Sequence, residues 1–202
     1  MRRIGLFGGS FDPVHIAHLA LAREALAALQ LDDLRWIPVG QAWQKTRRMT
    51  APEHREAMLL LAMAGESRFV LERCELEREG PSFTLATVRE LQAAQADALW
   101  FLIIGQDQFE SFHTWHGWQE LLGLVTLAVA QRPGAMSSAD PEVLRAPHVA
   151  LALPPMQVSA SEIRARVAAG RAVGDLVPPA VARYIARHHL YTGDTQELNG
   201  HS

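Results

Sequence analysis

Cysteine is almost absent from this chain of 202 residues, which contains only Cys74. A single cysteine excludes an intrachain disulfide and any metal cage that needs several thiolates. Cys74 lies in an alternating stretch from Val70 to Leu76, where we expect an unreactive thiol. The sequence therefore predicts neither a disulfide framework nor a cysteine-based metal centre.

An excess of positive charge is also missing. The 19 Lys and Arg residues face 22 Asp and Glu residues, which gives a net charge of −3 at pH 7. With no basic surplus to neutralise a phosphate backbone, DNA or RNA is not expected as the main partner. A hydrophobic fraction of 49% and a charged fraction of 20% are typical of a folded domain with a sizeable core.

Long apolar runs are lacking as well. The longest, Leu121–Ala130, is too short to cross a bilayer. Arg2 and Arg3 are followed by an apolar segment that breaks at Gly8-Gly9, which does not fit a signal peptide. We therefore expect a cytoplasmic protein that does not associate with a membrane.

Short apolar runs alternate with segments of helical period over most of the chain. Leu99–Ile104 has no polar alternation, as expected of a strand buried on both faces of a parallel sheet. This alternation predicts the α/β class with a doubly wound parallel sheet. The predicted strands are Arg3–Phe7, Leu34–Val39, Phe69–Cys74, Leu99–Ile104, Leu124–Ala130 and Val149–Leu153, and the predicted helices are Ile16–Leu29, Pro52–Ala64, Thr84–Ala94 and Trp118–Leu122.

The last quarter of the chain changes character. Ser159–Ala169 and Pro179–His188 have helical period with no strand between them. We expect a small helical subdomain over residues 159–191, which completes a single domain of residues 1–191. Residues 192–202 are polar and are expected to form a flexible tail.

Glycines and polar residues follow five of the predicted strands. The loops begin at Gly8, Gly40, Gly105, Gln131 and Pro154. In a doubly wound sheet, ligands bind at the carboxyl ends of the strands. We therefore expect these five loops to line one binding site at one edge of the sheet.

The first of these loops has the features of an anion site. Gly8-Gly9 permits close backbone approach, and the helix that follows offers free N–H groups to an anion. His15 and His18 share one helix face, where they could polarise phosphate oxygens or bind a metal, although no third ligand is evident. The alternative is that Asp12-Pro13 merely caps the helix and that the histidines lie on the surface.

A second anion site is predicted at the start of the late helix. Ser159 and Glu162 form a capping-box pair. Arg164 lies three residues after Ser161 and leans toward the helix N-terminus, so a hydroxyl, a guanidinium and a helix end could clamp a triphosphate there. The alternative is ordinary capping with a solvated arginine.

The two motifs together resemble those of the H-x-G-H nucleotidyltransferases. Residues 8–18, GGSFDPVHIAH, match the signature except that Ala17 replaces the usual glycine, and residues 159–164, SASEIR, match the late S-x-S/T-x-x-R element. The dinucleotide fingerprint and the P-loop are absent, which disfavours a dehydrogenase. The resemblance implies a Rossmann-like nucleotidyltransferase fold with ATP held by Gly8, Gly9, Ser10, Phe11, His15, His18, Ser159, Ser161 and Arg164.

The segments between the motifs resemble bacterial nicotinate-mononucleotide adenylyltransferases, over nearly the whole chain from Ile4 to about Tyr191. The resemblance implies transfer of AMP from ATP to nicotinate mononucleotide, with release of pyrophosphate and formation of deamido-NAD in NAD biosynthesis. The matching segments are residues 81–87 (PSFTLAT), residues 105–109 (GQDQF) with Trp115, Lys45 in a loop that otherwise departs from the family pattern, His54-Arg55 and Met58-Leu59.

The same resemblance implies roles on the acceptor side. Trp115 stacks on the pyridine ring, and backbone N–H groups around Thr84 and His116 meet its carboxylate. The acceptor-binding set is Lys45, Thr84, Asp107, Trp115, His116 and Arg132. Mg²⁺ is expected on the substrate phosphates, with few protein ligands.

Catalysis in this scheme needs no general base, because the attacking phosphate is already ionised. His15, His18 and Arg164 would align two anions and stabilise charge on the α-phosphate. Three alternatives stay open: a related transferase using nicotinamide mononucleotide or phosphopantetheine, a cytidylyltransferase, or a non-catalytic nucleotide-binding regulator. The oligomeric state does not follow from the sequence.

Overall fold

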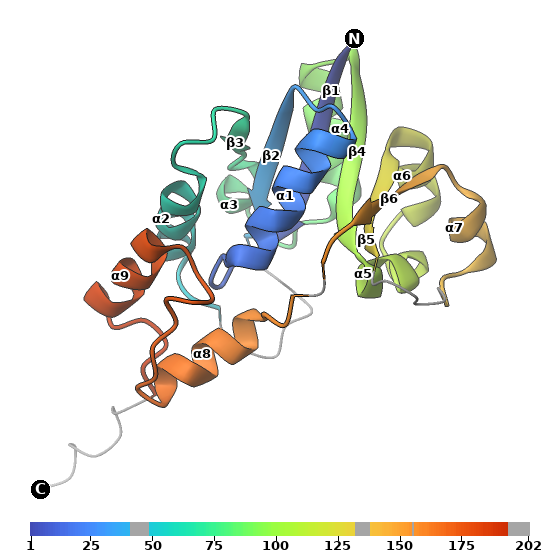
Figure 1. Ribbon diagram of the computed structural model, residues 1–202. Coiled ribbons are helices and arrows are strands. Elements are labelled where there is room, and N and C mark those ends of the chain that lie inside the picture. Colours follow the sequence, from blue (N-terminus) through green and yellow to red (C-terminus); the bar gives the residue numbers. More distant parts are fainter. Residues whose placement is uncertain (41–48, 132–137, 155, 194–202) are drawn as a thin grey trace, which may run out of the picture.

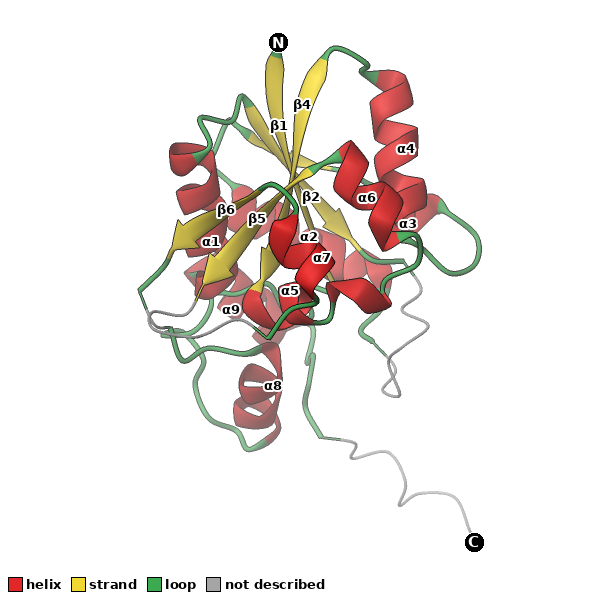
Figure 2. Ribbon diagram, turned by 90° about the vertical axis from the view of Figure 1, so that its right-hand side faces the viewer, coloured by secondary structure: helices red, strands yellow, loops and turns green. Residues whose placement is uncertain are grey.

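The computed structural model describes residues 1–40, 49–131, 138–154 and 156–193, which form a parallel sheet covered by helices on both faces (Figures 1 and 2). The sheet has six strands in the order β3-β2-β1-β4-β5-β6. The chain winds outward from β1 to β3, then crosses back to place β4 on the other side of β1. The predicted doubly wound α/β fold is confirmed, and the strand order reverses between β1 and β4, where such sheets bind ligands.

All six predicted strands are present. β3 ends before Cys74 because the chain turns into the short helix α3, Cys74–Glu77, and β5 starts late because α6 continues to Leu124. The prediction that these two strands include Cys74 and Leu124 was therefore wrong. The strands are β1 (Arg2–Gly9), β2 (Asp33–Pro38), β3 (Phe69–Leu71), β4 (Ala98–Gly105), β5 (Thr126–Gln131) and β6 (His148–Ala152).

The predicted helices are confirmed to within two residues at each end. They are α1 (Ile16–Ala28), α2 (Pro52–Met63), α4 (Thr84–Ala94), α6 (Trp118–Leu124), α8 (Ala160–Ala168) and α9 (Pro179–Arg187). Sequence patterning missed α3, α5 (Gln106–Glu110), the 3₁₀ turn η1 (Phe112–Thr114) and α7 (Pro141–Arg145), each of which has five residues or fewer. Elements this short do not complete enough turns to give a periodic signal.

The sheet divides the core into two layers. Phe101 and Ile103 of β4 face the layer formed with α1, α2, α8 and α9. Trp100 and Leu102 face the opposite layer, formed with α4, α5, α6 and α7. Side chains therefore leave β4 alternately to two buried faces, which explains why its sequence is apolar throughout. The two C-terminal helices share the first layer with α1, as Figure 1 shows.

Among the described residues, no helix has both the length and the apolar character required to span a membrane. The predicted tail, residues 192–202, lies almost entirely outside the described part of the chain.

Gly40 permits the close approach of α3 to the end of β2. A Cβ added to Gly40 would lie 2.0 Å from the main-chain oxygen of Glu75, which is backbone and cannot swing aside. We expect Gly40→Ala to lower the free energy of unfolding by roughly 1–3 kcal/mol, as overpacking does. Chemical denaturation of the purified variant measures this change.

Gly123→Ala is the matched control for that measurement. Gly123 lies in α6 with no other group within 4 Å of an added Cβ. The substitution should leave stability unchanged or raise it by up to ~1 kcal/mol, because alanine has the higher helix propensity. Equal effects of the two substitutions would contradict the steric account.

Candidate active site

The loop after β1 is built on a buried phenylalanine. The Phe11 side chain is only 1% exposed, and its ring contacts Trp36 at 5.2 Å and His18 at 5.1 Å between centroids. A Cβ on Gly9 would meet this ring at 2.9 Å, so the glycine makes room for it. The Phe11 side chain, predicted among the ATP-binding residues, therefore supports the loop from the core rather than facing the rim.

His15 and His18 are brought together at the start of α1. Their rings stack with centroids 3.6 Å apart and an interplanar angle of 22°. The backbone N–H of His15 donates to Nδ1 of His18 at 3.2 Å. Because Nδ1 accepts this bond, we assign the proton of the neutral His18 ring to Nε2, where it can be donated to a ligand.

The alternative in which Asp12-Pro13 merely caps the helix is wrong. α1 begins at Ile16 with His15 as its N-cap residue. Asp12 is instead buried, at 1% exposure, and is hydrogen-bonded to residues from three other parts of the chain.

Both histidines are neutral at pH 7 in the free protein. Burial lowers the pKa of His15 to about 4. Burial, and then the neighbouring His15, lower the pKa of His18 well below its ordinary value of 6.5. The stacked rings therefore offer hydrogen bonds to a phosphate rather than two permanent positive charges.

The structure brings the second motif to the first. Arg164, on α8, donates from Nη1 to the main-chain oxygen of Asp12 at 2.7 Å and from Nη2 to Oγ of Ser161 at 3.0 Å. Ser159 is the N-cap residue of α8, and its Oγ accepts from the backbone N–H of Glu162 at 3.1 Å. The guanidinium of Arg164 thus lies against the loop that precedes the two histidines, as the second anion site requires.

Arg55 was matched to the family pattern without a role, and the structure shows that its buried guanidinium fixes this loop. Arg55, on α2, is 1% exposed and donates to the main-chain oxygens of Thr50 at 3.0 Å and Ser10 at 3.1 Å. A longer contact of 3.5 Å reaches the main-chain oxygen of Gly40. Arg55 therefore ties the loops after β1 and β2 to the start of α2, and an arginine on the apolar face of a helix is the signal that could have revealed it.

Asp12 joins the same network from the other side. Its carboxylate accepts from the hydroxyl of Tyr191 at 2.7 Å and from the backbone N–H of Thr50 at 3.2 Å. The negative charge of Asp12 opposes the burial that lowers the pKa of Arg55. A buried cation and a buried carboxylate are thus held in one polar cluster beneath the loop.

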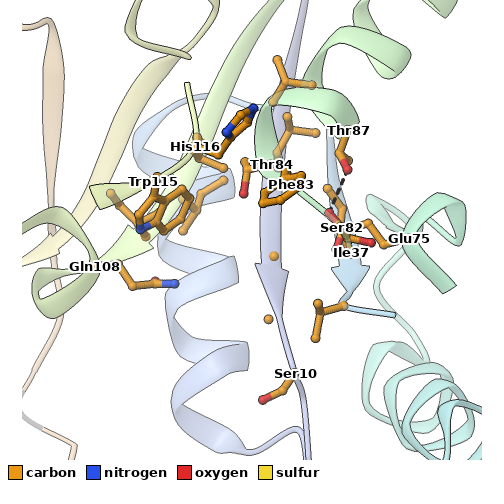
Figure 3. A pocket seen from close by; sticks show the side chains of 18 of the residues that line it. Ser10, Ile37, Glu75, Ser82, Phe83, Thr84, Thr87, Gln108, Trp115 and His116 are labelled. Atoms are coloured by element: carbon orange, nitrogen blue, oxygen red, sulfur yellow. Dashed lines mark hydrogen bonds between the residues drawn. The ribbon is translucent and has the colours of Figure 1, made fainter. Parts of the chain in front are cut away.

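A cavity of about 650 Å³ opens beside this loop, at the carboxyl ends of β1, β2 and β4. Figure 3 shows Trp115 and His116 at one end of it, with Glu75 and Thr87 at the other. Ser10 lies along its lower side, and Gly8 and Gly9 also line it. The cavity therefore reaches from the first motif to the predicted acceptor-binding residues.

Two helix N-termini meet at the Trp115 end. Thr84 is the first residue of α4, and His116 precedes Gly117, the N-cap residue of α6. Gly117 has φ of 67°, in the left-handed region that favours glycine. The free N–H groups of a helix N-terminus favour a bound anion, so this end of the cavity is suited to a carboxylate.

Three further residues were predicted to bind the acceptor, namely Asp107, Lys45 and Arg132. Asp107 lies on α5 but is not among the residues that line the cavity, whereas its neighbour Gln108 is. The Gln108 side-chain oxygen accepts from the backbone N–H of Gly105 at 3.1 Å. Lys45 and Arg132 lie outside the described residues.

The far end of the cavity contains polar residues that sequence reasoning did not select. Thr87 Oγ1 donates to Oε1 of Glu75 at 2.8 Å and accepts from Nη1 of Arg78 at 2.9 Å. Burial raises the pKa of Glu75. The Ser82 hydroxyl is buried without a hydrogen-bond partner in the described part of the chain.

Metal ligands and a reactive thiol are two groups that a catalytic site could use. Across residues 1–40, 49–131, 138–154 and 156–193, no group of three or more His, Cys, Asp or Glu side chains is placed to hold a metal ion. Cys74 is partly buried, and burial together with acidic neighbours raises its pKa to about 12. Its thiol is therefore protonated at pH 7 and unsuited to act as a nucleophile.

The two joined motifs beside a cavity of nucleotide size are typical of a nucleotide-binding transferase. Comparison with known proteins agrees with this class. The sequence profile described as cytidylyltransferase-like matches residues 6–166. The chain is 54% identical to a probable nicotinate-nucleotide adenylyltransferase of Methylibium petroleiphilum, over 94% of this chain and 92% of the relative. It is 48% identical to the Bordetella petrii protein of the same name, over 95% of this chain and 100% of the relative.

Solved structures show the same fold. A Plasmodium falciparum nicotinic acid mononucleotide adenylyltransferase complexed with NaAD superposes with a TM-score of 0.80 at 18% identity, over 95% of this chain and 98% of the other. The chain belongs to the cytidylyltransferase-like nucleotidyltransferases, and within them to the nicotinate-nucleotide adenylyltransferases.

The low pKa of His15 predicts how stability changes with pH. The folded value of about 4 lies below the ordinary value near 6.5, so the unfolded chain binds the extra proton. Its contribution to stability is complete above pH 6.5 and is lost as the pH falls from 6.5 toward 4. We expect His15→Asn to reduce the loss of unfolding free energy between pH 6.5 and 5 by up to about 1 kcal/mol per pH unit.

Urea denaturation of both proteins at several pH values measures this difference. His113→Asn is the control, because it makes the same substitution at an exposed residue of η1. A His15→Asn variant as sensitive to acid as the unmodified protein would contradict the assignment of a neutral, buried His15.

Proposed function

We propose that this chain transfers AMP from ATP to nicotinate mononucleotide, with the triphosphate held by the two motifs and the pyridine nucleotide held in the cavity. The observation that carries the proposal is the hydrogen bond from Arg164 to the main-chain oxygen of Asp12. This bond joins the late motif to the histidine loop, next to a cavity of the size expected for a nucleotide.

The ATP side consists of hydrogen-bond donors that converge on one place. His18 would donate from Nε2 to the α-phosphate, and Arg164 would use its remaining N–H groups on the phosphates. The N-terminus of α8 adds free backbone N–H groups. Such donors stabilise charge that develops on phosphorus during the displacement.

The acceptor supplies the nucleophile, so the protein needs neither a general base nor a nucleophilic side chain. An oxygen of the acceptor phosphate attacks the α-phosphorus, a new P–O bond forms, and the bond to pyrophosphate breaks. Both partners are anions, which makes alignment against their repulsion the main task of the site. The neutral histidines and the cationic Arg164 together provide that alignment.

The acceptor side fits a pyridine carboxylate. Trp115 offers a ring face at one end of the cavity, and the N-terminal N–H groups near Thr84 and His116 offer donors to a carboxylate. The Plasmodium falciparum neighbour that shares the fold is complexed with NaAD. Recognition of nicotinate by backbone N–H groups would discriminate against the amide, because its NH₂ group presents two donors in place of an acceptor oxygen.

Mg²⁺ would enter with ATP. The nitrogen donors of His15 and His18 do not suit an ion that prefers oxygen ligands, and the Asp12 carboxylate is already bonded to Tyr191 and Thr50. The phosphate oxygens would therefore carry most of the coordination. When bound, the ion neutralises phosphate charge and favours departure of pyrophosphate.

Pyrophosphate release with ATP and Mg²⁺ tests the proposed function. Nicotinate mononucleotide, nicotinamide mononucleotide and phosphopantetheine are compared as acceptors. We expect kcat/KM to favour the nicotinate form by about a hundredfold, ~2.7 kcal/mol. Equal use of both pyridine nucleotides would remove the specificity, and ATP binding without turnover on any acceptor would favour a regulator.

His18→Ala tests the catalytic step. Loss of one preorganised donor to the developing charge should lower kcat by roughly 10²–10³-fold with a much smaller change in KM. His113→Ala, at an exposed position of η1, is the matched control and should retain full activity. A His18→Ala variant with unchanged kcat would exclude this histidine from the mechanism.

A further inference from the structure

Tyr191 lies close to the end of the described chain, yet its side chain reaches the loop after β1. Its hydroxyl donates to Oδ1 of Asp12 at 2.7 Å, across 179 positions of sequence. Tyr191 also has φ of 61°, in the left-handed region that a residue with a Cβ rarely adopts. Such a backbone persists when the surroundings hold it, and here the partly buried side chain and its hydrogen bond to Asp12 provide that hold.

Two different groups of Asp12 connect Tyr191 to Arg164. The carboxylate of Asp12 accepts the Tyr191 hydroxyl, and the main-chain oxygen of the same residue accepts Nη1 of Arg164 at 2.7 Å. Because Asp12 is 1% exposed and is also held by the backbone N–H of Thr50, it has little freedom to rotate. A displacement of its carboxylate would therefore move the carbonyl that orients Arg164.

We propose that Tyr191 is a positioning residue of the adenylyl-transfer site, which holds Asp12 so that the Asp12 carbonyl orients Arg164 toward the phosphates of ATP. This inference rests on the proposed function. Tyr191 itself contacts neither substrate in this scheme. The segment that follows α9 thereby supports the ATP site, and the docking of Tyr191 is coupled to the geometry of the phosphate clamp.

The hydroxyl is suited to this role at every working pH. Burial, and then the negative charge of Asp12 and the hydrogen bond to it, raise the pKa of Tyr191, so the group stays protonated and remains a donor. The Thr50 side chain forms a further hydrogen bond with this hydroxyl, which acts in the opposite direction on the pKa.

A purely structural role is the competing explanation, but the C-terminal helices have other anchors. The backbone N–H of Ile16 donates to the main-chain oxygen of Leu176 at 3.0 Å. Tyr184 on α9 shares a hydrogen bond of 2.9 Å with Nδ1 of His54 on α2. Val181 and Ile185 are buried in the core layer that contains α1. These contacts would keep α9 in place without the Tyr191 hydroxyl.

Tyr191→Phe in the full-length chain tests the proposal, with Tyr184→Phe as the matched control. Each substitution removes one hydroxyl that takes part in a hydrogen bond at the C-terminal end of the chain. For both variants we would measure kcat, the KM of each substrate, the Kd of ATP without acceptor by calorimetry, and thermal unfolding.

We expect Tyr191→Phe to weaken ATP binding and to lower kcat/KM for ATP on the order of tenfold, as loss of a hydrogen bond to a charged group does. The KM of nicotinate mononucleotide should not change, because Trp115 and the N-termini of α4 and α6 are untouched. Tyr184→Phe should leave all kinetic parameters unchanged while costing similar stability. In an Asp12→Asn background, Tyr191→Phe should add little further effect, since the two residues act as one unit.

Unchanged ATP affinity and kinetics in Tyr191→Phe, or equal losses in both tyrosine variants, would overturn the proposal and leave Tyr191 a structural anchor. A wild-type protein that binds ATP but transfers AMP to no acceptor would refute the proposed function alone, and the ATP affinities of the variants would still decide the role of Tyr191. A wild-type protein that does not bind ATP would refute both.

Discussion

The buried guanidinium of Arg55 is the constraint on which the rest of the site depends. A cation without contact with water is unstable unless its N–H groups are bonded and its charge is balanced. Arg55 meets the first need with main-chain oxygens of Ser10 and Thr50, and the buried carboxylate of Asp12 meets the second. Burial lowers the pKa of Arg55, but an arginine remains charged at neutral pH, so the cluster is held together by permanent charge.

That cluster ties together two loops, the one after β1 and the one between β2 and α2. Ser10 follows β1, Gly40 follows β2, and Thr50 precedes α2, and each contributes its main-chain oxygen to Arg55. Every residue has a main-chain oxygen whatever its side chain. The side chains of these loops can therefore vary while the guanidinium still holds the loops. The β1 loop is thereby set in position before any ligand arrives, and the stacked histidines and Arg164 take their places relative to it.

The sequence specified the fold well because the fold depends on patterns that a single sequence displays. Strong apolar runs such as Leu99–Ile104 and long helical periods predicted every strand and every helix of more than five residues. The short helices α3, α5 and α7 were missed because four or five residues do not reveal a period. The extra length given to β3 has the same origin, since α3 begins where an alternating pattern continues.

The sequence predicted site residues only where they lie together in a short motif. His15 with His18, and Ser161 with Arg164, were selected because each pair is three residues apart at the start of a helix and because both motifs resemble those of the H-x-G-H nucleotidyltransferases. Arg55 and Tyr191 act through contacts that span many positions of sequence, which no local pattern encodes. Phe11 lies inside a binding motif, yet its side chain packs in the core, a contribution that the motif does not reveal.

The electrostatic state of the histidine pair explains how the site can receive a polyanion without being destabilised when empty. Two charged imidazoles stacked at 3.6 Å would repel each other. Burial keeps both rings neutral, and the backbone N–H of His15 keeps the Nε2 proton of His18 available as a donor. Arg164, whose guanidinium bonds the Asp12 carbonyl and the Ser161 hydroxyl, is then the permanent cation of the two motifs. In the proposed reaction Arg164 would provide charge for the phosphates and the histidines would provide hydrogen bonds. Donors placed in this way would stabilise the charge that develops on the phosphates during transfer.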